Sequence, residues 1–110
     1  MKRVLTALAC AAALTMAVGM TAMAEDKTYT IGFEPYTLTN EYFTAVLNGV
    51  QIACEETGCE LIYYDPQSDP TKQASQVDDM IAAGIDAIIY LPYDSASCRT
   101  VLQNLKDNGV

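Results

Sequence analysis

The stretch that decides the fold is Ile31-Gly32-Phe33-Glu34-Pro35-Tyr36-Thr37-Leu38-Thr39-Asn40-Glu41-Tyr42-Phe43. Its apolar start predicts a strand over residues 30–34, which ends at Pro35. Asn40 is placed to cap a helix over about residues 41–57, because its side chain can accept from the free backbone N–H groups of the first turn. A strand that leads through a loop into a helix places the loop at the carboxyl end of a parallel sheet, where open α/β folds bind ligands.

The same pattern of strand, loop, helix and glycine occurs twice more. A strand over residues 60–64 precedes a helix that Asp69 caps and Pro70 opens, and Gly84 ends it. A strand over residues 87–91 precedes a helix that Asp94 or Ser95 caps. The last strand is continuously apolar, which predicts burial on both faces. Right-handed crossovers then give an α/β fold in three layers: a parallel, Rossmann-like half-sheet with strand order 2-1-3.

Helical spacing predicts which side chains each helix packs against the sheet. The expected inner faces are Phe43, Val46, Leu47, Val50, Ala53 and Cys54 in the first helix, Ala74, Val77, Met80 and Ile81 in the second, and Cys98, Val101, Leu102 and Leu105 in the third.

Residues 1–24 have the layout of a secretory signal peptide. Lys2 and Arg3 precede an apolar run over residues 4–20, and Ala22-Met23-Ala24 forms a cleavage site. An uncleaved anchor is the alternative, although the run is shorter than the ~20 apolar residues that span a bilayer. Lipid attachment at Cys10 is less favoured because this cysteine lies inside the apolar run. We therefore expect an exported protein of the periplasm or cell envelope, with residues 25–110 as the folded part.

Charge and composition exclude several kinds of function. Removing Lys2 and Arg3 leaves four basic against fourteen acidic side chains, so phosphate contacts with nucleic acid are not expected. The chain has no histidine, no phosphate-binding glycine loop and no nucleophile elbow, so we predict no catalytic residues, no metal and no cofactor. Cys54 and Cys59 could form a disulfide in an oxidising compartment. The alternative, which we favour, is that Cys54 is a small core residue.

A small-molecule site is predicted where the first and third strands end. The candidate ligand-binding residues are Tyr36, Asn40, Tyr42, Phe43, Leu91 and Asp94. Sugars suit aromatic rings beside an amide, since their C–H faces stack and their hydroxyls need hydrogen-bond partners. For some candidates a structural role is the alternative: Phe43 could belong to the core, and Asp94, like Asp65, could serve only its turn or cap.

The chain resembles the periplasmic sugar-binding proteins of the ribose- and galactose-binding family, which are type I periplasmic binding proteins. The resemblance covers about residues 31–110. Its three motifs are residues 31–43, residues 65–87 (Asp65-Pro66-Gln67-Ser68-Asp69-Pro70 onward) and residues 87–95, which include Pro92-Tyr93-Asp94-Ser95.

The resemblance implies two lobes that close on a sugar, after which the protein docks on the membrane subunits of an ABC-type importer. It implies ligand contacts by Tyr36, Asn40, Tyr42 and, with less weight, Phe43. Tyr42 would stack on the sugar ring and Asn40 would bond its hydroxyls. One position departs from the pattern: many relatives place an asparagine where this chain has Leu91. A leucine abolishes that hydroxyl contact.

Three other functions remain open, and the expected domain is partial. The chain could be the exported sensing domain of a membrane-bound receptor or kinase, the sensor half of a sugar-responsive repressor, or an α/β enzyme. The export signal disfavours the repressor, and no catalytic motif supports the enzyme. We expect residues 25–110 to be part of an amino-terminal lobe, with a complete small protein as the alternative.

Overall fold

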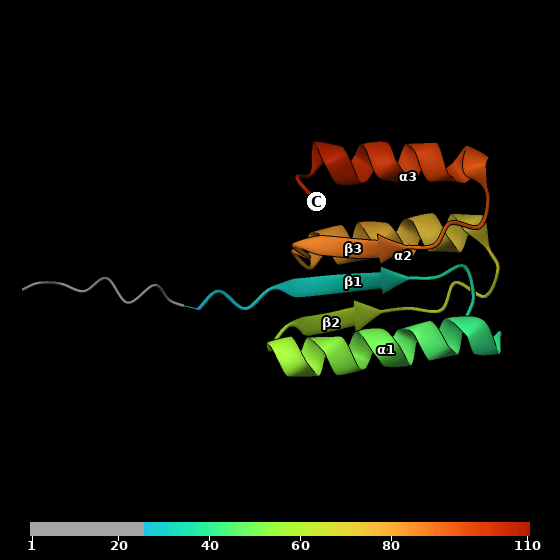
Figure 1. Ribbon diagram of the computed structural model, residues 1–110. Helices are drawn as coiled ribbons and strands as arrows, with labels where there is room; N and C mark the ends of the chain where they lie inside the picture. Colours follow the sequence, from blue (N-terminus) through green and yellow to red (C-terminus); the bar gives the residue numbers. More distant parts are fainter. Residues whose placement is uncertain (1–25) are drawn as a thin grey trace, which may run out of the picture.

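A computed structural model describes residues 26–110, and the signal peptide predicted over residues 1–24 lies outside them. Figure 1 shows strands and helices that alternate along the chain. Their bounds are β1 Thr30–Glu34, α1 Glu41–Thr57, β2 Glu60–Tyr63, α2 Pro70–Ala82, β3 Ala87–Tyr90 and α3 Ser95–Asp107. The predicted second and third strands each extend one residue beyond the observed ones.

The three strands form one parallel sheet in the order β2-β1-β3, so the predicted topology is confirmed. In the central strand, Ile31 is paired with Leu61 on one side and with Ala87 on the other. Side chains alternate between the two faces of the sheet. Gly32 faces α2, since a Cβ atom there would lie 2.9 Å from the Met80 sulfur. Ile31 faces the opposite side, where α1 lies.

Each helix is capped at its amino end by a polar residue that the sequence predicted. The Asn40 side chain accepts from the Tyr42 N–H at 2.8 Å, and the Asp69 side chain accepts from the Thr71 N–H at 2.8 Å. Asp94 accepts from the N–H groups of Ala96 and Ser97, so it, not Ser95, caps α3. These bonds satisfy backbone donors that a helix leaves free at its amino end. All three amino ends lie at the carboxyl edge of the sheet, on the right of Figure 1.

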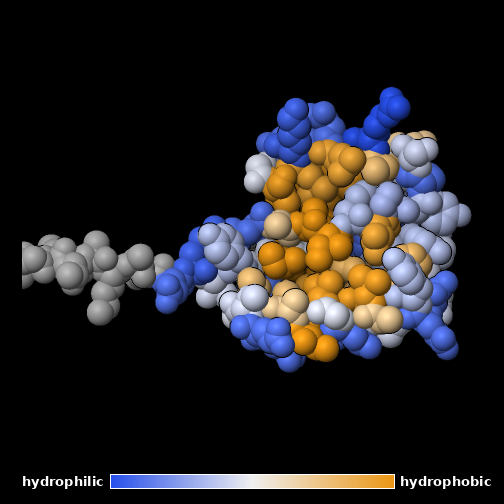
Figure 2. All heavy atoms as spheres, viewed as in Figure 1, coloured by the Kyte–Doolittle hydropathy of each residue, from blue (hydrophilic) through white to orange (hydrophobic). Residues whose placement is uncertain are grey.

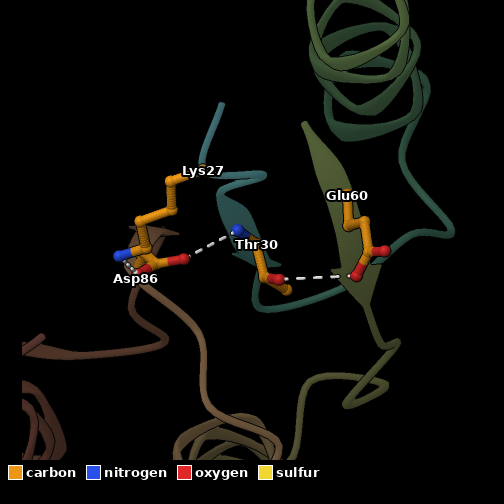
Figure 3. Close-up of polar contacts among 4 residues, drawn as sticks. All are labelled: Lys27, Thr30, Glu60 and Asp86. Carbon is orange, nitrogen blue, oxygen red and sulfur yellow. Dashed lines mark hydrogen bonds and ion pairs between the residues drawn. The ribbon is translucent and has the colours of Figure 1, made fainter. Parts of the chain in front are cut away.

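The amino edge of the sheet is held by side-chain contacts at the first residue of β1. Figure 3 shows Asp86 between Lys27 and Thr30. The Asp86 carboxylate is 2.6 Å from Lys27 Nζ and accepts from the Thr30 N–H at 2.9 Å. These two hydrogen bonds lower the pKa of Asp86. The Thr30 hydroxyl donates to Glu60 at 3.5 Å, so the side chain of Thr30 also contacts β2.

The core lies mainly between the sheet and α2, with α3 packed on α2. Val77 is completely buried, and Val101 and Leu105 of α3 pack against it. Leu102 is 51 % exposed, so its assignment to the inner face of α3 was wrong. Its position is one residue beyond Val101, on the side of the helix that turns away from α2.

The prediction that β3 is buried on both faces was also wrong. Ile88 and Tyr90 are half-buried on the α2 side, but Ala87 is exposed and Ile89 is 39 % exposed on the other. The reason is that α1 contacts β1 and β2, and no other described element covers this face. Figure 2 shows the resulting apolar surface. Ala53 of α1 borders it and is exposed rather than buried as expected.

Among residues 26–110, no helix is both long and apolar enough to cross a membrane.

Candidate functional site

The candidate site lies at the carboxyl edge of the sheet, where three loops lead into the three helices (Figure 1). Hydrogen bonds join these loops to one another. The Leu91 N–H donates to the Glu34 carbonyl at 2.9 Å, which joins the ends of β1 and β3. The Ser68 N–H donates to the Tyr36 carbonyl at 2.8 Å, which joins the loops after β1 and β2. The edge is therefore one connected surface.

Four aromatic rings form a continuous cluster at this edge. Tyr36 packs edge-to-face on Phe43, with ring centroids 4.6 Å apart, and on Tyr93 at 6.2 Å. Tyr42 packs on Phe43 at 5.1 Å. Tyr42 is 65 % exposed and Tyr93 is 48 % exposed, whereas Phe43 is 8 % exposed. Phe43 therefore forms the base of the cluster, and the tyrosines carry its accessible rings.

The polar candidates differ in how much of their hydrogen-bonding capacity is committed. The Asn40 oxygen is bonded to the Tyr42 N–H, while its amide NH₂ group makes no hydrogen bond within residues 26–110. One oxygen of Asp94 accepts from Ala96 and Ser97, and the bonds from Ser97 in particular lower the pKa of Asp94. Asp65 accepts from the N–H groups of Leu38 and Gln67. Asp65 and Asp94 thus have the structural roles considered as alternatives.

Leu91 contributes only an apolar side chain to the edge. Its N–H is bonded to the Glu34 carbonyl, and its own carbonyl accepts from the Gln73 side chain at 3.0 Å. Its side chain is half-buried. Both backbone groups of Leu91 are therefore committed, and a ligand at this point would meet methyl groups.

Gln73 was not among the residues predicted for the site; it lies in the first turns of α2 and is 1 % exposed. Its amide nitrogen donates to the carbonyls of Pro35 at 2.9 Å and Leu91 at 3.0 Å. Its amide oxygen accepts from the Tyr93 N–H at 3.0 Å. The signal was present, because Gln73 falls on the helical face that Val77 and Met80 share and so had to point inward.

Glu34 was placed in the first strand but given no role. It is completely buried, and neither carboxylate oxygen has a hydrogen-bond partner among the described residues. Burial raises the pKa of Glu34 to about 8, the negative charge of Asp65 acts in the same direction, and Lys72 opposes both. The side chain is thus largely neutral at pH 7. The sequence did contain a signal for Glu34, because a charged residue stands at the end of an otherwise apolar strand.

The described cysteines are free thiols: Cys54 is buried, and Cys59 and Cys98 are half-buried. Cys54 is a core residue, the alternative that we favoured. Burial raises the pKa of the Cys54 thiol. No group of three metal-ligating side chains occurs within residues 26–110.

Residues 31–110 match the family model described as a periplasmic binding protein domain. The chain belongs to this family. Ribose import binding protein RbsB of Bacillus subtilis is 34% identical to it over 84 residues, which cover 76% of this chain and 28% of the relative. A xylitol-binding protein of Mycolicibacterium smegmatis is 31% identical over 108 residues, or 93% of this chain and 31% of the relative. The resemblance inferred from the sequence is thereby confirmed.

Solved structures of the family share the fold. A solute-binding protein of an ABC transporter from Mycobacterium smegmatis, with bound glycerol, has a TM-score of 0.72 at 28% identity and aligns with 76% of this chain and 29% of its own. A galactofuranose-binding protein has a TM-score of 0.69 at 27% identity, and the alignment covers 74% of this chain and 28% of that protein. The chain spans less than a third of the length of these family members. The named relatives are binding proteins.

Proposed function

We propose that this chain forms part of the solute-binding component of an ABC-type importer, which binds a monosaccharide or related polyol outside the cytoplasmic membrane. The observation that carries the proposal is the aromatic cluster at the carboxyl edge, with Tyr42 and Tyr93 accessible above a buried Phe43. The names of the relatives support the import role and the class of ligand: ribose import, xylitol binding and galactofuranose binding.

The chemistry of the edge suits a neutral, partly apolar ligand. The face of a sugar ring presents C–H groups, which an exposed aromatic ring such as that of Tyr42 can cover. The free NH₂ group of Asn40 would donate to a hydroxyl oxygen, and the tyrosine hydroxyls can either donate or accept. Asn40 can cap α1 and bind ligand at once, because these roles use different atoms.

Leu91 narrows the class of ligand. A hydroxyl that pointed toward the end of β3 would lose its water and gain no partner there, since the Leu91 side chain is apolar and its backbone groups are committed. An unpaired buried polar group costs about 1–3 kcal/mol. We infer a ligand with a hydrogen or methyl group at that point, such as a deoxysugar or a less hydroxylated polyol.

The remaining contacts would come from a second lobe, and docking would involve the membrane subunits of the importer. The exported location depends on the signal predicted over residues 1–24. In this arrangement the edge that carries Tyr36, Asn40 and Tyr42 forms one wall of the closing cleft, and the opposite wall completes the enclosure of the ligand.

A thermal-shift screen tests the proposal on the mature protein expressed from its complete reading frame. Neutral monosaccharides, deoxysugars and polyols are compared with amino acids as a negative set. A ligand at a hundred times its dissociation constant should stabilise the protein by about 2.7 kcal/mol. If every sugar and polyol leaves the melting temperature unchanged while an amino acid raises it, the proposed ligand class is wrong.

A further inference from the structure

We propose that Gln73 is a positioning residue, which holds the loops after β1 and β3 in the arrangement that the ligand requires. This inference rests on the proposed function. The side chain of Gln73 reaches from α2 to three points at the carboxyl edge: the carbonyls of Pro35 and Leu91 and the N–H of Tyr93. These points lie 18 to 38 residues from Gln73 along the chain.

Each contacted backbone group is next to, or part of, a residue of the candidate site. Pro35 immediately precedes Tyr36, and Leu91 and Tyr93 belong to the loop after β3. No other hydrogen bond among the described residues satisfies the Pro35 carbonyl, the Leu91 carbonyl or the Tyr93 N–H. The Gln73 amide therefore links the residue before Tyr36 to the backbone of Tyr93, and the rings of these two tyrosines lie 6.2 Å apart.

Only an amide side chain can make all three of these hydrogen bonds. Two carbonyls need a group with two N–H donors, and the Tyr93 N–H needs an acceptor on the same side chain, which glutamine supplies. The Tyr90 hydroxyl adds a longer contact to the amide oxygen at 3.4 Å. Burial raises the pKa of Tyr90 to about 12, so this hydroxyl keeps its proton and can donate at neutral pH. A carboxylate at position 73 would place an oxygen against the two carbonyls.

The experiment compares stability with affinity for one probe, the neutral monosaccharide or polyol that gives the largest thermal shift, in the mature protein from its complete reading frame. The variants are Gln73→Glu and Gln73→Leu. The matched control is Val77→Ala, one turn further along α2, because Val77 is completely buried but packs against α3 instead of the edge loops. We expect both Gln73 variants, when folded, to bind the sugar or polyol with a dissociation constant about tenfold or more higher than that of the wild type. Val77→Ala should lower the melting temperature and leave the dissociation constant unchanged.

The pH dependence of Gln73→Glu gives a second readout. At pH 5 a protonated glutamic acid could donate to one carbonyl, whereas the ionised form at pH 8 could donate to neither. The affinity of Gln73→Glu should therefore improve from pH 8 to pH 5 relative to the wild type. Unchanged dissociation constants in the folded Gln73 variants would overturn the inference. A wild-type protein that binds no sugar or polyol would instead overturn the proposed function.

A measurement on the wild type covers the case in which neither Gln73 variant folds. Hydrogen exchange followed by NMR reports on the Tyr93 N–H directly. The bond to Gln73 should slow its exchange about tenfold or more relative to an unprotected peptide, with further slowing when ligand binds. Exchange of the Tyr93 N–H at the unprotected rate would show that Gln73 does not hold this loop.

Discussion

The rings of Tyr36 and Tyr93 lie 6.2 Å apart between centroids, with their planes inclined by 80°. One ring follows β1 and the other follows β3, so residues far apart in the sequence meet above the end of the sheet. The hydrogen bond from the Leu91 N–H to the Glu34 carbonyl fixes the two strand ends beneath them. This pair marks the part of the edge where the loops after β1 and β3 are in contact.

Replacing either tyrosine should weaken ligand binding. We expect Tyr36→Ala and Tyr93→Ala each to raise the dissociation constant about tenfold, because each substitution removes a ring that would cover C–H groups of the ligand, at about 25 cal/mol per Å² of apolar surface. The measurement is calorimetric titration, with the double variant to complete a mutant cycle. Tyr29→Ala is the control, since Tyr29 is 51 % exposed and precedes β1 at the opposite edge. If Tyr29→Ala weakens binding as much as the other two, the location of the site is wrong.

The stability of Glu34→Gln relative to the wild type should increase as the pH rises. In the folded state the pKa of Glu34 is raised to about 8 from an ordinary value of 4.5. The stabilisation from the neutral acid is therefore complete below about pH 4.5 and is lost as the pH approaches 8. A glutamine carries no such dependence. The full pKa difference corresponds to about 5 kcal/mol, and relaxation of the protein and entry of water around the ionised carboxylate reduce the expected gain to about 2–3 kcal/mol above pH 8.

Urea unfolding of the wild type and Glu34→Gln at pH 5, 7 and 8.5 measures this effect. The control is Glu56→Gln, an exposed position on α1. A difference between wild type and Glu34→Gln that stays constant over this pH range would mean that Glu34 is ionised throughout in the folded protein.

Gly32 and Gly49 should respond in opposite directions to alanine. A Cβ atom on Gly32 would lie 2.9 Å from the Met80 sulfur and 3.2 Å from Ile85, so Gly32→Ala should cost about 1–3 kcal/mol. Gly49 is inside α1, and apart from its chain neighbours and the backbone of that helix, no atom of residues 26–110 lies within 4 Å of a Cβ atom there. Gly49→Ala should therefore stabilise the protein by about 0.5–1 kcal/mol. Chemical denaturation checks both, and equal effects would contradict the packing of α2 on β1.

The three described cysteines should all react as thiols after denaturation without reductant. In the native protein, Cys54 should react more slowly with an alkylating reagent than Cys59, because Cys54 is buried and burial raises its pKa. Mass spectrometry of labelled peptides identifies the sites. Recovery of a disulfide between Cys54 and Cys59 would contradict the free thiols described above.

Local signals were sufficient to predict most of the fold. The caps at Asn40 and Asp69 and the alternation of apolar strands with helices led to the observed elements and strand order. The exposure of Ile89 could not be predicted in this way. An apolar strand shows only that its side chains favour burial, and which face is covered depends on where the helices lie.

The candidate site could be predicted only in part. Loops at the carboxyl edge follow from topology, which is why Tyr36 and Phe43 were identified and are in contact. Gln73 was missed because it belongs to a helix outside those loops, and its importance depends on backbone groups far away in the sequence. Glu34 was missed because its burial depends on elements that pack around β1 from elsewhere in the chain, rather than on its sequence neighbours.

The edge that carries Tyr36, Asn40 and Tyr42 is proposed to bind a neutral sugar or polyol. The most direct measurement is calorimetric titration of the best compound from the thermal-shift screen into the mature protein and its Tyr42→Ala variant. We expect saturable binding by the wild type and a dissociation constant about tenfold or more higher for Tyr42→Ala, with a loss of stability of at most about 1.5 kcal/mol from the contact between Tyr42 and Phe43. Equal affinities for the two proteins would contradict it.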